Sequence, residues 1–131
     1  GGERSFRVVH VSHSPRVRLV REFLNASEAA AVIELVAARF ERSMAGNRVE
    51  SIRSSSTAYL RNRGMGPLVE ELTERAARLT GYDFGQIEPL QVVRYKAGEE
   101  YKPHFDFGGS CDFLENLYIG RRHVTMLVYL N

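Results

Sequence analysis

The sequence predicts an α+β fold in a single domain. Two amphipathic helical patterns come first, strand-like runs dominate after residue 82, and no internal repeat is visible. Helices followed by strands are typical of helices packed against an antiparallel sheet. A chain of 131 residues, 44% of them hydrophobic, suits one globular domain and argues against a disordered chain.

The first strand and the first helix are predicted by alternation and by a capping signal. Apolar residues alternate with arginines over 16–23, as in a half-buried strand. Asn25 and Glu28 then have the spacing of a capping box. Apolar residues follow at helical intervals, so we expect the helix to continue to about Arg42.

A second helix is predicted after a polar stretch. Residues 43–50 are typical of a loop, 51–60 are β-prone, and 62–66 form a glycine-containing turn. Pro67 suits the first position of a helix, because its missing N–H has no partner there in any case. Gly81 supplies a left-handed stop, so the helix should end there.

Strands are predicted for three later runs, 88–95, 101–107 and 121–130. The connection 108–120 between the last two is long for an ordinary loop, so it is either functional or mobile.

Charge and hydropathy favour no strongly charged partner. The chain has 18 basic and 16 acidic residues and a net charge of +2, so we expect no nucleic-acid partner. The arginines are separated by apolar residues, as on a solvent-facing surface. No run approaches the roughly 18 apolar residues of a membrane span. The single cysteine, Cys111, cannot form an intramolecular disulfide.

The strongest chemical signal is His104-Phe105-Asp106. Residues two apart in a strand project from the same face, so the imidazole and the carboxylate should converge. Two histidines and one carboxylate form the triad that holds Fe(II) and leaves positions open for reactants. On spacing alone, an ion pair or a hydrogen bond between the two side chains is the more common explanation, because most His and Asp residues serve structure or solvent. Metal binding stays open beside it.

Other candidate ligands are weaker. His10 and His13 lack further ligands at suitable spacing, which favours solvated side chains. Cys111 and Asp112 would complete a zinc site only if their loop faced His104 and Asp106. His123 could approach the same site, but packing beside Arg122 is the favoured interpretation.

Four segments, in this order and at these separations, resemble the catalytic domain of the prolyl 4-hydroxylase family: FLNASEAAAVIELV, RSSS, EPLQVVRYKAGEEYKPHFDF and RRHVTMLVYLN. The resemblance runs from about Pro15 to Asn131. The family consists of Fe(II)- and 2-oxoglutarate-dependent dioxygenases on a double-stranded β-helix, a jelly roll. The resemblance therefore implies a helical support region over 1–81 and the first strands of the β-helix over 82–131.

The resemblance also implies residue roles. His104 and Asp106 match the catalytic iron ligands, and Tyr95 and Tyr129 match positions that line the 2-oxoglutarate pocket. The positions that contact the peptide correspond to Arg53, Ser55, Glu88, Tyr101 and Arg122. Arginine donors and aromatic faces suit an extended proline-rich peptide, whose carbonyl groups are exposed. Packing roles for the tyrosines and surface roles for the arginines remain alternatives.

The activity implied is that of a procollagen-proline 4-dioxygenase, which hydroxylates proline in a peptide or protein to 4-hydroxyproline. Its cofactors would be Fe(II), 2-oxoglutarate and ascorbate. The alternative is a non-catalytic module that binds proline-rich peptides on a truncated oxygenase fold. Another member of the oxygenase superfamily, acting on a different side chain, would share the His-x-Asp motif. Family members occur in the secretory pathway and in the cytoplasm, and we expect the secretory pathway here.

The sequence departs from the family pattern at its end. In the family, further strands carry a distal histidine ligand and a lysine that pairs with 2-oxoglutarate. These residues have no counterpart before Asn131. We expect a further C-terminal segment, or a second polypeptide, to supply them together with the second half of the β-helix.

Overall fold

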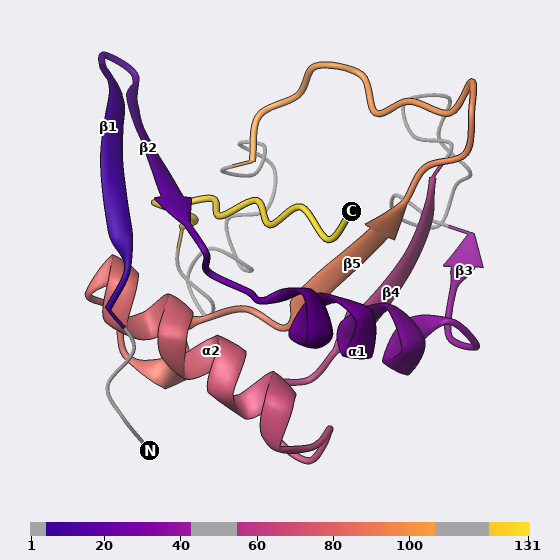
Figure 1. The fold of residues 1–131 in the computed structure, drawn as a ribbon. Helices are drawn as coiled ribbons and strands as arrows, with labels where there is room; N and C mark the ends of the chain where they lie inside the picture. The colour runs from indigo at the N-terminus through magenta and orange to yellow at the C-terminus, as the bar shows by residue number, and fades with distance from the viewer. Residues whose placement is uncertain (1–4, 43–54, 107–120) are drawn as a thin grey trace. The chain divides into compact units, whose positions relative to one another are not determined.

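The computed structural model describes residues 5–42, 55–106 and 121–131. These residues form a small α+β arrangement with two α-helices, one short 3-10 helix (Phe84–Gln86) and two antiparallel sheets, one of two strands and one of three (Figure 1). The chain divides into two compact units. The first unit comprises Gly1–Leu35 with Val128–Asn131, and the second comprises Val36–Leu127. The predicted α+β class is therefore confirmed. The prediction of one domain, with a helical support region over 1–81 and β-helix strands over 82–131, stays a prediction.

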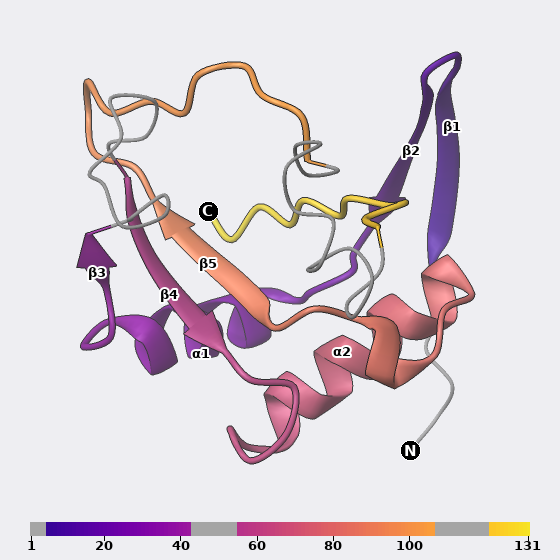
Figure 2. The same cartoon turned by 180° about the vertical axis from the view of Figure 1, so that it is seen from behind.

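The first unit contains a β-hairpin. Strands β1 (Arg7–His13) and β2 (Arg16–Arg21) pair antiparallel across a turn at Ser14-Pro15, whose peptide bond is cis (Figures 1 and 2). Strand β2 confirms the predicted strand, although it ends two residues earlier. Strand β1 was not predicted, because its valines do not alternate regularly with polar residues and a register shift interrupts the ladder between His10 and Ser12.

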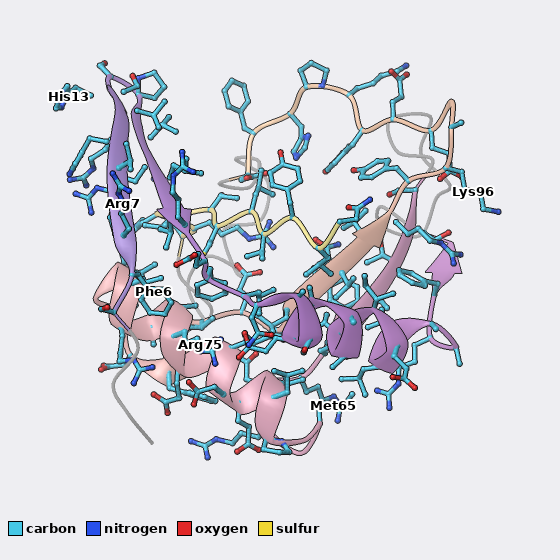
Figure 3. The ribbon with its side chains drawn as sticks, viewed as in Figure 1. Phe6, Arg7, His13, Met65, Arg75 and Lys96 are labelled. Carbon is cyan, nitrogen blue, oxygen red and sulfur yellow. The ribbon has the colours of Figure 1, made fainter. Side chains whose placement is uncertain are left out.

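Basic residues face one another across this hairpin. The register pairs Arg7 with Arg21, and it pairs His13 at the tip with the first arginine of β2; Figure 3 labels Arg7 and His13 at the two ends of β1. Arg7 and Arg21 carry like charges, which are destabilising when directly opposite in a sheet, and both are exposed to water, which weakens their repulsion. Both His10 and His13 are exposed, as predicted.

Helix α1 (Ala26–Val36) begins where the capping signal predicts. The Glu28 amide donates to Asn25 Oδ1 over 2.8 Å, and the Asn25 amide donates to Glu28 Oε2 over 2.9 Å. These reciprocal bonds satisfy backbone donors that have no partner inside the helix. The predicted end near Arg42 is wrong, because the helix stops at Val36 and the Arg39 amide closes a tight turn onto the Val36 carbonyl.

Tertiary contacts in the second unit explain this early stop. Strand β3 (Glu41–Arg42) pairs with strand β4 (Ser56–Leu60), so its backbone groups bond to a neighbouring strand instead of continuing the helix. The guanidinium of Arg94 lies 4.4 Å from the centre of the Phe40 ring, which adds a cation–π contact. Both contacts require residues far along the chain, so local periodicity cannot reveal them.

Strand β4 is the central strand of the three-stranded sheet, between β3 and β5 (Leu90–Arg94). It lies within the predicted β-prone stretch, and β5 lies within the predicted strand 88–95. Leu60 is fully buried and Ala58 nearly so, which places the core of this sheet along one face of β4. Tyr59 projects outward and accepts a hydrogen bond from the Gln91 side chain over 2.9 Å.

Helix α2 (Pro67–Thr80) confirms the second predicted helix with both ends as expected. Gly81 has φ 78° and its amide donates to the Ala77 carbonyl, which is the left-handed stop. The helix buries one stripe, formed by Val69, Leu72, Thr73, Ala76 and Ala77. Arg75, labelled in Figure 3, is buried beside this stripe, and its charge is paired with Glu71 at 3.0 Å.

Two of the predicted strands are not formed. Tyr101 makes a single isolated bridge and residues 102–106 are irregular, while 121–131 are extended without belonging to a ladder. A strand requires a hydrogen-bonded ladder with a neighbour, and among the described residues neither run belongs to a sheet. The structure does not describe residues 43–54 or 107–120. These ranges include the predicted loop 43–50, the whole connection 108–120, Arg53, Cys111 and Asp112. None of the described helices is long and apolar enough to cross a membrane.

Candidate functional site

His104 and Asp106 converge in the second unit. The His104 Nε2 atom lies 3.0 Å from Asp106 Oδ1, and both side chains are partly exposed. The predicted convergence is therefore confirmed, but its predicted cause is wrong, because an irregular turn and not a strand brings the two together. Tyr101 packs on this pair: its ring stacks on the imidazole with centroids 3.6 Å apart and planes 22° apart.

The protonation of His104 is constrained by its other ring nitrogen. Nδ1 lies 2.8 Å from the carbonyl oxygen of Lys102. A carbonyl only accepts hydrogen bonds, so Nδ1 carries a hydrogen and donates it. In the neutral ring, Nε2 then presents a lone pair toward Asp106 Oδ1, which is also an acceptor. Two acceptors this close require a cation between them or on one of them, either a proton on Nε2 or a metal ion.

The geometry of this pair fits a metal ion. Imidazole nitrogens and carboxylate oxygens bind zinc, a comparable divalent metal, at about 2.0–2.2 Å. Two ligands at such distances and at the right angle of an octahedral site stand about 3.0 Å apart. This is the separation observed here, and it is equally the length of a direct hydrogen bond between the two side chains. Histidine and carboxylate are also the ligand types of a non-haem Fe(II) site. Among the described residues, no third His, Cys, Asp or Glu joins the pair.

Asp106 is held by two residues of the extended segment 121–127. The Thr125 hydroxyl donates to Asp106 Oδ2 over 2.7 Å, so the two carboxylate oxygens have different partners. The Arg122 Nη1 atom donates to the Asp106 backbone carbonyl over 3.4 Å. Thr125 has no role in the sequence analysis, because its contact depends on how two separate segments meet.

Glu88 and Arg122 are brought together directly. The Arg122 Nε and Nη2 atoms donate to the two Glu88 oxygens over 2.6 and 2.8 Å, a bidentate ion pair. The hydrogen bond to Glu88 raises the pKa of Arg122 above its ordinary value. Their predicted role in peptide contact stays a prediction. In the structure each residue is the other's partner, so Glu88 fixes the direction of the arginine.

The remaining predicted site residues are distributed differently. Ser55 is fully buried immediately before β4, and Tyr95 follows β5 with its side chain about half exposed. Tyr129 is highly exposed and belongs to the first unit, whereas His104 and Asp106 belong to the second. The roles of these residues, and that of Arg53, stay predictions.

His123 does not join the pair formed by His104 and Asp106. Its Nδ1 lies 3.2 Å from the Tyr82 hydroxyl, and the two rings are tilted with centroids 6.4 Å apart. The ring therefore packs against a tyrosine that follows α2, where the sequence analysis favoured packing beside Arg122.

Comparison with known proteins identifies relatives although no protein-family model matches the chain. The chain is 34% identical over 131 residues to probable prolyl 4-hydroxylase 7 of Arabidopsis thaliana, covering 95% of this chain and 40% of that protein. It is 33% identical over 131 residues to prolyl 4-hydroxylase subunit alpha-3 of Homo sapiens, covering 95% and 24%. For prolyl 4-hydroxylase 5 of Arabidopsis thaliana the identity is 31% over 136 residues, covering 99% and 45%.

These relatives agree with the resemblance of the four sequence segments. The chain spans less than half the length of each curated relative, between 24% and 45% for these three. The match covers nearly the whole chain, and it includes the turn that brings His104 and Asp106 together. Over nearly its whole length, the chain is similar to curated prolyl 4-hydroxylases, which supports its relationship to that family.

Proposed function

We propose that this chain is part of an Fe(II)- and 2-oxoglutarate-dependent dioxygenase that hydroxylates proline in a peptide to 4-hydroxyproline. The observation that carries the proposal is the approach of His104 Nε2 to Asp106 Oδ1 at 3.0 Å, while His104 Nδ1 and Asp106 Oδ2 are held by other partners. The names of the curated relatives support the same activity.

His104 and Asp106 would hold the iron. The Lys102 carbonyl fixes the imidazole tautomer, and the stacked Tyr101 ring limits its rotation, so Nε2 keeps its direction. When bound, Fe(II) supplies the coupling of dioxygen reduction to 2-oxoglutarate decarboxylation and proline hydroxylation, with succinate and carbon dioxide as products. Ascorbate would serve to keep the iron reduced.

The cosubstrate pocket is proposed to include Tyr95 and Tyr129. A tyrosine has an apolar body and a polar hydroxyl, so it can line a pocket and still bond a carboxylate. The double-stranded β-helix belongs to this proposal as well. In it, the run 121–131 would form a strand.

The peptide is proposed to contact Arg53, Ser55, Glu88, Tyr101 and Arg122. Glu88 orients the Arg122 guanidinium through two hydrogen bonds and thereby reduces the freedom that the arginine loses when it binds a peptide carbonyl. A secretory location fits a substrate of the procollagen type and is part of the same proposal.

Succinate formation tests this function. The purified protein is supplied with Fe(II), 2-oxoglutarate, ascorbate and a panel of proline-containing peptides, and a chelated sample serves as the control. We expect succinate that requires both iron and peptide. Peptide binding without turnover in an iron-loaded sample would refute the enzyme and favour a non-catalytic peptide-binding module.

A further inference from the structure

We infer that Thr125 is a positioning residue that makes Asp106 present a single oxygen to the cation. This inference rests on the proposed function, because it concerns the same two-residue site. It is based on the different partners of the two Asp106 carboxylate oxygens. Oδ1 faces His104 Nε2 at 3.0 Å, while Oδ2 accepts a hydrogen bond from the Thr125 hydroxyl over 2.7 Å.

An aspartate needs such a contact to keep one orientation. The last torsion of its side chain is broad and roughly two-fold, so rotation readily exchanges the two oxygens or brings both toward a cation. A hydrogen bond from a neutral hydroxyl to a carboxylate is charge-assisted and short. Thr125 thereby holds Oδ2 away from the imidazole and leaves Oδ1 as the ligand atom.

The segment that carries Thr125 is itself fixed in this unit. Three residues earlier, Arg122 binds both oxygens of Glu88 and also donates to the Asp106 backbone carbonyl. The segment 122–125 therefore contacts Asp106 at two points, at the carbonyl and at the carboxylate. This double contact sets the position of Asp106 relative to His104 although no strand ladder joins the two segments.

One-oxygen binding has a chemical consequence. A carboxylate that binds through both oxygens occupies two positions around a metal ion, whereas binding through one leaves a position open for another ligand. Residues that orient metal ligands typically change metal affinity by about 10–100-fold when removed. The loss of the Thr125 hydroxyl is therefore expected to weaken metal binding within this range, without removing either ligand.

The test is a titration of the protein with Co(II) alone, followed by visible absorbance, in wild type and three variants. Thr125→Val keeps the shape and removes the hydroxyl, Thr125→Ser keeps the hydroxyl, and Thr80→Val makes the same exchange at a hydroxyl that bonds only helix carbonyls. We expect Co(II) affinity about 10–100-fold weaker in Thr125→Val, and affinity close to wild type in the other two. Circular dichroism checks that each variant is folded.

The outcomes distinguish the positioning role of Thr125 from the existence of the metal site. Equal affinity of Thr125→Val and wild type overturns the positioning role while leaving the metal site intact. Equal weakening in Thr125→Val and Thr125→Ser also overturns it, because the variant that keeps the hydroxyl would then be as impaired as the variant that lacks it. A wild-type protein that binds no Co(II) refutes the metal site itself, and the positioning role with it.

Discussion

Truncation of Leu60 should reveal how strongly the sheet of the second unit depends on its central strand. Leu60 is fully buried in β4, whereas Leu127, in the same unit, is 77% exposed. Leu→Ala removes three carbon atoms, worth about 0.8 kcal/mol each when fully buried, or roughly 2.4 kcal/mol before any cavity is counted. With the cavity, we expect Leu60→Ala to lower the free energy of unfolding by about 2–5 kcal/mol.

Leu127→Ala is the matched control, because it deletes the same atoms from a side chain that is mostly in water. About a quarter of its surface is buried, so the expected loss is only about 0.5 kcal/mol. The assay is urea unfolding followed by far-UV circular dichroism, since the chain has no tryptophan. Equal losses in the two variants would refute the assignment of Leu60 to the core of this sheet.

Two further predictions concern a helix end and the ion pair. Gly81→Ala should destabilise the protein by about 1–2 kcal/mol, because φ 78° is unfavourable for a residue with a Cβ atom, while Gly85→Ala, outside the left-handed region, should not be destabilising. Thermal unfolding checks this pair, and similar losses in both would contradict the conformational explanation. Glu88 and Arg122 are about half exposed, so a double-mutant cycle in unfolding free energy should give a coupling of about 0.2–1 kcal/mol that weakens with salt. A coupling of several kcal/mol would contradict this description.

The elements predicted correctly are those encoded by neighbouring residues. Both ends of α2 follow from Pro67 and Gly81, and the start of α1 follows from the Asn25 and Glu28 pair, because these signals act within one turn of helix. The end of α1 depends on pairing between β3 and β4, far apart in sequence. The runs 101–107 and 121–130 have the composition of strands, but composition does not provide a hydrogen-bonded neighbour.

In the candidate site, too, the feature encoded by neighbouring residues was predicted, and the features set by distant residues were not. The spacing of His104 and Asp106 predicted their convergence, although the backbone between them is irregular. The partners that orient this pair were beyond sequence reasoning. One is the Lys102 backbone carbonyl, which every residue type possesses, and the other is the Thr125 hydroxyl from a separate segment.

The central claim is that the turn containing His104 and Asp106 is the iron site of a prolyl hydroxylase. Its most direct test is mass spectrometry of a proline-containing peptide after incubation with the protein, Fe(II), 2-oxoglutarate and ascorbate. The wild type and His13→Ala, an exposed histidine in β1, should both convert proline to hydroxyproline, whereas His104→Ala should convert none and remain folded. Hydroxylation by His104→Ala at the wild-type level would contradict the claim.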